Sequence, residues 1–115
     1  MIGIDILEIE RVKDLTLQPG RVFTQQEVNY IHEKKCKLET IAGLFCAKEA
    51  VLKALGTGIG NQTGFMQVEI FHTALGQPTV TLYGKAKEIL LSLGKEIFLS
   101  ITHSATTAVA VAIIK

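Results

Sequence analysis

The chain has 115 residues, a length typical of one small domain with a real hydrophobic core. Its formal net charge is +1, only 20% of its residues are charged, and it shows no basic stripe with interleaved aromatic residues, which argues against nucleic-acid binding. No apolar run approaches membrane-spanning length. The N-terminus also lacks a basic region followed by an uninterrupted apolar stretch, so we expect a cytoplasmic protein that does not enter a membrane.

Hydrophobic residues make up 48% of the chain before its ten glycines are counted. Soluble domains typically reach about 45–50% with glycine included. The excess has two explanations: a somewhat larger single core, or an apolar surface that is buried against another subunit. The two cysteines, Cys36 and Cys46, do not form a C-x-x-C pair and suit a reducing compartment.

The N-terminal segment MIGIDIL alternates in the way that a strand does. Ile2, Ile4 and Ile6 share one face, and Asp5 lies on the opposite face. An acidic residue within an N-terminal strand is unexpected and needs a reason. A short helix is expected in the following segment, EIERVKDL.

Two further helices are expected before the next strand. Thr24 and Glu27 form a capping box, which predicts a helix from this point to about residue 35. A longer helix is expected over residues 38–55, with Gly56 at its C′ position.

The second half of the chain predicts two hairpins separated by a helix. MQVEIFH and TVTLY alternate apolar and polar residues, as do EIFLSIT and TAVAVAII, and KAKEILLSL predicts a helix that ends at Gly94. The order of elements is therefore β-α-α-α-β-β-α-β-β. We expect one α+β domain over residues 1–115, with a mostly antiparallel sheet packed with helices.

The glycine-rich segment GTGIG at residues 56–60 does not match the common phosphate loops. No Gly-Lys-Ser/Thr follows it, and G-x-G-x-x-G fails because Asn61 stands three residues after Gly58. The segment also follows a helix, and the dipole at a helix C-terminus repels anions. A helix cap and turn is the simpler interpretation, and a phosphate bound here would need lysines or a metal ion.

Glu49 and Lys53 lie four residues apart in the expected long helix, in the favourable order for an ion pair. A solvated surface pair is one interpretation. The flanking residues are apolar nearly all round, however, which favours a buried helix whose charges lie in a cleft or interface. Asp5 is the natural partner of Glu49, because two carboxylates with water suit Mg²⁺.

His103 lies between two expected strands, as either a turn residue or a group that transfers a proton or contacts phosphate. His32 and His72 form no metal-ligand spacing with it, so zinc is not expected. Ser104 lacks a G-x-S-x-G context, so a hydrolase triad is not expected either.

Three motifs in this order and spacing resemble the holo-acyl-carrier-protein synthases, the short single-domain phosphopantetheinyl transferases. They are GIDILEIERV at the N-terminus, FCAKEAVLKALGTGIG in the middle and SITHSATTAVAVAII at the end. The resemblance covers essentially the whole chain, and K-E-A-x-x-K-A-x-G-T-G is its specific part. It implies transfer of 4′-phosphopantetheine from coenzyme A to a serine of apo acyl carrier protein, with release of adenosine 3′,5′-bisphosphate.

The resemblance also implies roles for individual residues, Mg²⁺ dependence, and a homotrimer with active sites at its subunit interfaces. It makes Asp5 and Glu49 metal ligands, with Glu49, Lys53 and His103 at the catalytic centre. The expected coenzyme A contacts are Lys48, Lys53, Gly56, Thr57 and His103, and Arg11 and Arg21 are expected to face the acidic carrier protein. The base that activates the carrier serine is left open between Glu49, a metal-bound water and another group.

Two positions depart from the family pattern. Leu44 stands where the family commonly has an arginine, and that arginine reaches the adenosine end of coenzyme A. Gln77 stands where lysine is frequent. Two other functions remain possible from the sequence. One is a non-catalytic trimeric module that binds coenzyme A or a carrier protein; the other is a metal-dependent phosphohydrolase acting on a nucleotide.

Overall fold

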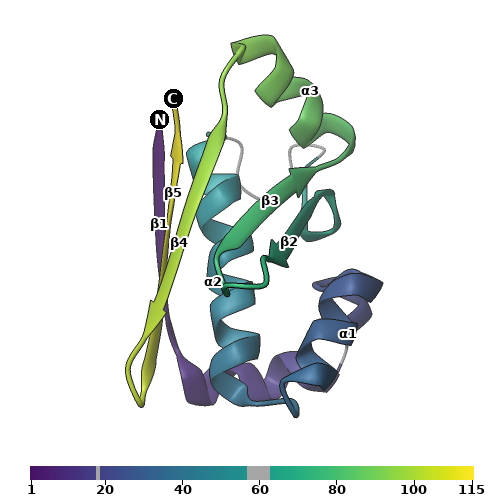
Figure 1. The fold of residues 1–115 in the computed structure, drawn as a ribbon, viewed down its shortest axis with the longest axis vertical. Helices are drawn as coiled ribbons and strands as arrows, with labels where there is room; N and C mark the ends of the chain where they lie inside the picture. The colour runs from purple at the N-terminus through teal and green to yellow at the C-terminus, as the bar shows by residue number, and fades with distance from the viewer. Residues whose placement is uncertain (18, 57–62) are drawn as a thin grey trace.

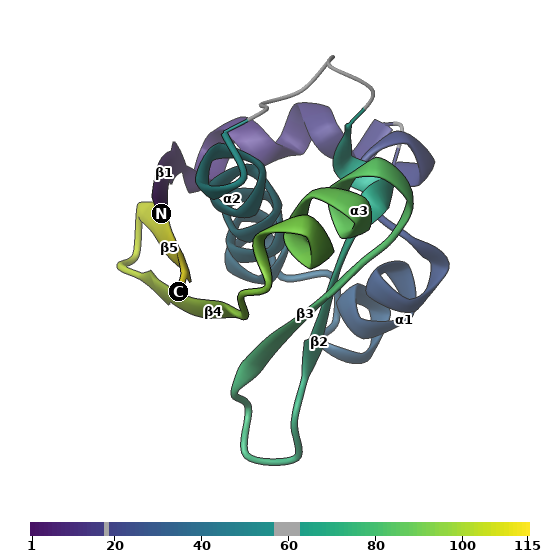
Figure 2. The same cartoon turned by 90° about the horizontal axis from the view of Figure 1, so that it is seen from above.

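The longest helix, α2 (Leu38–Ala54), runs through the middle of the protein, and the other elements pack around it (Figures 1 and 2). The computed structural model describes residues 1–17, 19–56 and 63–115. A three-stranded antiparallel sheet in the order β1-β5-β4 covers one side of α2. The two-stranded hairpin β2-β3 lies on the other side, flanked by α1 and α3 (Figure 2).

The predicted order of elements and their antiparallel pairing are confirmed, and the strands form two sheets. None of the helices in the described part of the chain has the length and apolar character needed to cross a bilayer. The remaining elements, in chain order, are β1 (Ile2–Glu8), η1 (Ile9–Leu17), η2 (Pro19–Arg21), α1 (Gln25–Glu33), η3 (Phe65–Gln67), β2 (Val68–His72), β3 (Pro78–Leu82), α3 (Gly84–Leu93), β4 (Ile97–His103) and β5 (Thr107–Ile114).

The structure contains the predicted capping box at the start of α1 and the predicted glycine after the end of α2. Thr24 Oγ1 accepts a hydrogen bond from the backbone N–H of Glu27, and the backbone N–H of Thr24 donates to Glu27 Oε1 at 2.9 Å, which confirms the capping box. Helix α2 ends with Gly56 in the left-handed region at φ +78°, a conformation that glycine adopts without a Cβ penalty.

The segment after β1 is a 3₁₀-helix, η1, in place of the expected α-helix. Among residues 9–14, whose burial the structure describes, Ile9 and Val12 are buried and lie three positions apart. Side chains at i and i+3 eclipse one another in a 3₁₀-helix. The tighter winding therefore directs Ile9 and Val12 to the same face, towards the core.

Strand β1 and helix α2 approach each other unusually closely at Gly3. A Cβ atom at this position would lie 2.1 Å from the backbone oxygen of Ala50 and 2.5 Å from the backbone nitrogen of Ala54. Because both neighbours are backbone atoms, no side chain can move aside to make room. Only glycine allows this contact, and it brings the inward face of β1 directly against α2.

We predict that Gly3→Ala destabilises the protein by about 1–3 kcal/mol or more, because overpacking here must push a strand away from a helix. Urea unfolding monitored by circular dichroism measures the change. Gly20→Ala is the matched control, since nothing lies within 4 Å of its added Cβ, and it should cost less than about 0.5 kcal/mol. Equal stabilities for the two variants would show that the β1–α2 contact is looser than described.

Candidate functional site

The inward face of β1 and the C-terminal half of α2 bring together Asp5, Glu49 and Lys53. Lys53 Nζ donates to Asp5 Oδ1 at 3.0 Å and to the backbone oxygen of Ile4 at 3.1 Å. Asp5 follows Gly3 by two residues and therefore points to the same side of the strand. The close contact at Gly3 is thus what delivers the strand carboxylate to the helix.

The charges of this cluster influence one another strongly. Burial raises the pKa of Glu49 above its ordinary value, the negative charge of Asp5 raises it further, and Lys53 opposes the shift. The hydrogen bond to Asp5 is the main cause that raises the pKa of Lys53, so its ammonium stays charged. The Lys53 side chain is 50% exposed, whereas that of Asp5 is only 14% exposed. The ammonium therefore remains accessible to an anionic ligand.

A buried thiol lies beneath the cluster. Cys46 Sγ lies 3.6 Å from the backbone oxygen of Ala108, and the residue is fully buried. Burial, and then the charge of Asp5, raises the pKa of Cys46 to about 12. The thiol stays protonated at neutral pH, so Cys46 is not a nucleophile.

The donor set at the cluster fits a hard divalent cation that is shared with a ligand. Within residues 1–17, 19–56 and 63–115, no group of three or more His, Cys, Asp or Glu side chains gathers as a metal site. Asp5 and Glu49 offer carboxylate oxygens, and Mg²⁺ is commonly held by one or two carboxylates plus substrate phosphates. Burial is the main cause that raises the pKa of Glu49, and the negative charge of Asp5 adds to it; a cation between the two carboxylates relieves this repulsion.

Lys48 lies apart from this cluster. Its side chain is fully buried, and its ammonium forms an ion pair with Glu27, which is also fully buried. Burial is the main cause that lowers the pKa of Lys48. The structure therefore gives no support to the expected contact of Lys48 with coenzyme A. The sequence pointed to Glu27 only as a helix cap, although a lysine in an apolar helix calls for a buried partner.

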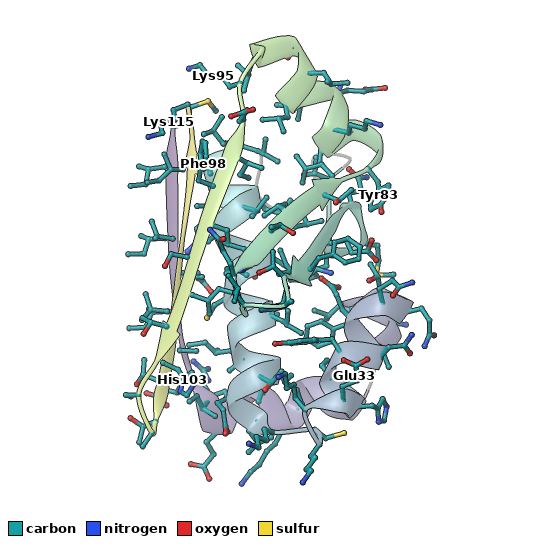
Figure 3. All side chains as sticks on the ribbon, in the orientation of Figure 1. Glu33, Tyr83, Lys95, Phe98, His103 and Lys115 are labelled. Carbon is teal, nitrogen blue, oxygen red and sulfur yellow. The ribbon has the colours of Figure 1, made fainter. Side chains whose placement is uncertain are left out.

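His103 is also outside the cluster, near the lower end of β4 (Figure 3). Asp5 pairs with Ala110 on β5, and Ala110 pairs with Ile101 on β4, so the full width of the sheet separates Asp5 from β4. His103 lies two residues beyond Ile101. It lines a cavity of about 270 Å³ together with Tyr30, Glu39, Thr40, Gly43, Leu44, His72, Gly76, Pro78 and Ile101.

The cavity contains a polar group that sequence reasoning missed. His72 stacks on Tyr30 with ring centroids 4.2 Å apart and planes nearly parallel. His72 Nδ1 is buried and has no hydrogen-bond partner among the described residues. Burial is the main cause that lowers the pKa of His72, with a further contribution from Lys34, so a neutral imidazole is favoured. The cavity thus offers an aromatic surface, and the unpartnered ring nitrogen of His72 is buried beside it.

The other predicted residues lie in different places. Gly56 is exposed at the end of α2, and Thr57 is outside the described residues. Arg11 on η1 and Arg21 on η2 are both exposed, as a docking surface requires. The two departures differ: Leu44 is buried and lines the cavity, while Gln77 is exposed in the turn between β2 and β3.

Comparison with known proteins identifies the family. The sequence profile of the 4′-phosphopantetheinyl transferase superfamily matches residues 1–113. A holo-(acyl-carrier-protein) synthase of Caldicellulosiruptor saccharolyticus is 50% identical, over 97% of this chain and 93% of the relative. One of Ruminiclostridium cellulolyticum is 44% identical, over 99% of this chain and 90% of the relative.

Solved structures agree in fold. The Helicobacter pylori holo-(acyl-carrier-protein) synthase in complex with coenzyme A has a TM-score of 0.86 and 32% identity, with both chains fully covered. A holo-(acyl-carrier-protein) synthase of Bacillus anthracis in complex with coenzyme A (3′,5′-ADP) has a TM-score of 0.80 and 34% identity, over 98% of this chain and 93% of the other. The chain therefore belongs to the 4′-phosphopantetheinyl transferase superfamily.

The raised pKa of Glu49 predicts how the stability of the folded protein changes with pH. A carboxyl whose pKa is higher in the folded than in the unfolded state is destabilising when ionised, at pH values above the folded-state pKa. This cost disappears as the pH falls through the folded-state pKa and below the ordinary value of 4.5. Glu49→Gln should therefore raise the metal-free melting temperature at pH 7, and the gain should shrink as the pH is lowered.

Calorimetry in the presence of a chelator, across this pH range, measures the effect. Glu88→Gln is the matched control, because it removes an exposed carboxylate on α3 and should shift the melting temperature little. A Glu49→Gln variant less stable than wild type at pH 7 would show that Glu49 is held by favourable contacts in place of repulsion.

Proposed function

We propose that this chain is a holo-(acyl-carrier-protein) synthase, which transfers 4′-phosphopantetheine from coenzyme A to a serine of apo acyl carrier protein. The single observation that carries the proposal is the Asp5–Glu49–Lys53 cluster, which lies in a chain whose whole length matches this family. One relative with this name is 50% identical, and two similar solved structures are complexes with coenzyme A or its 3′,5′-ADP part.

In this reaction the carrier serine oxygen bonds to the phosphorus that carries pantetheine. The bond from that phosphorus to adenosine 3′,5′-bisphosphate breaks, and the serine proton passes to a base. We propose that Asp5 and Glu49 hold Mg²⁺. When bound, the ion neutralises charge on the pyrophosphate oxygens.

Lys53 is proposed to stabilise the departing bisphosphate. Its ammonium is held by Asp5, remains charged and is half-exposed, so it can also contact a phosphate oxygen. A preorganised cation beside developing negative charge is a large source of catalysis.

The cavity lined by Leu44 and His103 is proposed to receive the adenosine end of coenzyme A. Tyr30 and His72 offer an aromatic wall there. In one chain this cavity lies at the N-terminal half of α2, whereas Glu49 and Lys53 lie in the C-terminal half. We therefore propose that His103 serves the Asp5 cluster of a neighbouring protomer.

The outer face of the three-stranded sheet supports a homotrimer. Ile2, Ile4 and Ile6 are 61–69% exposed on this face, and Phe98 and Ile113 of the neighbouring strands are also exposed. Side chains on this face project away from α2, and no other element of the described residues lies over them (Figure 3). An apolar sheet face of this kind is typical of a subunit interface.

The proposal predicts a mass gain. Incubation of an apo carrier protein with coenzyme A, Mg²⁺ and this protein should add phosphopantetheine to the carrier, as measured by mass spectrometry. Asp5→Asn should lower turnover by about 10²-fold or more, as for other groups that stabilise transition-state charge. Free phosphopantetheine without labelled carrier would indicate a hydrolase. No reaction at all would favour the non-catalytic module that binds coenzyme A or a carrier protein.

Arg11 supplies a specificity control in the same assay. Reversal of its exposed charge in Arg11→Glu should raise the KM for carrier protein far more than the KM for coenzyme A, because rim charges act mainly on association. Equal increases in both KM values would place the carrier elsewhere.

The trimer is tested separately. Sedimentation equilibrium should give about three times the 12.5 kDa of one chain, and Ile4→Lys should shift the mass towards one chain, because a lysine on this face would be buried unpaired. Leu91→Lys replaces a leucine that is 69% exposed on α3 and should leave the trimer intact. A fully active monomer would refute the proposed assembly.

A further inference from the structure

The Glu27–Lys48 ion pair joins three elements on the side of α2 opposite the candidate site. Glu27 Oε1 accepts from Lys48 Nζ and from the backbone N–H of Thr24, and Glu27 Oε2 accepts from the backbone N–H of Ile70 at 2.8 Å. One carboxylate therefore connects the start of α1, the middle of α2 and strand β2. Both charged side chains are fully buried.

Stability alone does not account for this pair. Two charges lose their hydration here, and burial is the main cause that lowers the pKa of Lys48. Replacement of a buried ion pair by apolar residues of similar volume is often neutral or stabilising. A second buried carboxylate, Glu69, lies close enough to favour the charged form of Lys48 and accepts a hydrogen bond from Tyr83 at 2.8 Å. Such a network does fix the orientation of α2 relative to α1 and β2.

The orientation matters because Lys48 immediately precedes Glu49. Successive residues in an α-helix are rotated by about 100°, so a lysine held towards Glu27 sets where Glu49 and Lys53 point. Side chains reach roughly 5–6 Å from the helix axis, so a rotation of roughly 20° would move a carboxylate by about 2 Å. A misplacement of 1 Å can cost about 10²-fold in rate.

We propose that Glu27 and Lys48 are positioning residues, which fix the rotation of α2 so that Glu49 and Lys53 meet Asp5 on β1. The contact at Gly3 sets the distance between strand and helix, and the ion pair sets the angle. The inference rests on the proposed transferase function, because transfer is one of its readouts. Lys48 then acts through Glu49 and touches no substrate.

The double variant Glu27→Gln with Lys48→Met tests this role. Glutamine keeps one acceptor oxygen for the Thr24 N–H but puts an NH2 group where Glu27 Oε2 accepts from the Ile70 N–H. Methionine keeps the volume of the lysine stem while both charges disappear. We expect a folded protein whose melting temperature is lowered by the loss of one buried hydrogen bond, and an unchanged KM for the carrier protein. We also expect kcat to fall by about tenfold or more and Mn²⁺ binding, measured by water-proton relaxation, to weaken.

The outcomes separate the two hypotheses. Wild-type enzyme that fails to transfer phosphopantetheine refutes the proposed function itself. Active wild type and a folded double variant with wild-type kcat and Mn²⁺ affinity overturn the positioning role alone. If the double variant does not fold, Lys48→Met by itself, which leaves Glu27 its two backbone donors, is measured in the same way, and the same results decide. Lys85→Met with Glu88→Gln removes an exposed pair on α3 and should change neither readout.

Discussion

The structure depends on one close backbone contact, between strand β1 and helix α2 at Gly3. No side chain fits there, since even a Cβ would lie 2.1 Å from a backbone oxygen. Because of this contact, strand β1 forms one side of the site, and Asp5 lies beside Glu49 and Lys53 of the helix. It also leaves the isoleucine face of the same strand pointing outward, where it remains exposed in the single chain. The site and the proposed subunit interface are thus the two faces of one strand.

Helix α2 carries the charges that a buried helix would otherwise avoid. On one side it presents Glu49, whose ionised form is destabilised by burial and by Asp5. On the other it presents Lys48, whose charge survives in the core through Glu27. Sites that bind and transfer charge often carry strain of this kind, because the relief comes from the ligand. The helix is stable because its remaining surface is almost wholly apolar and buried.

Much of this fold could be predicted from the sequence, because its signals are local. The capping box at Thr24, the glycine that ends α2 and the two alternating hairpins each depend on neighbouring residues. The Asp5–Glu49 pairing was predicted from chemistry, and the charges of the two carboxylates interact in the structure, while their role as metal ligands stays a prediction. The Glu27–Lys48 pair and the separation of His103 from Asp5 depend on contacts between distant segments, which no spacing along the chain encodes.

The central claim is that Asp5 and Glu49 form one cation site although they lie on different elements. Water-proton relaxation with Mn²⁺ in place of Mg²⁺ tests it directly, with and without adenosine 3′,5′-bisphosphate. Wild-type protein should bind the ion, the nucleotide should tighten it, and Asp5→Asn and Glu49→Gln should each weaken binding while the fold stays intact. Both variants binding Mn²⁺ as wild type does would contradict the claim and place the metal site elsewhere.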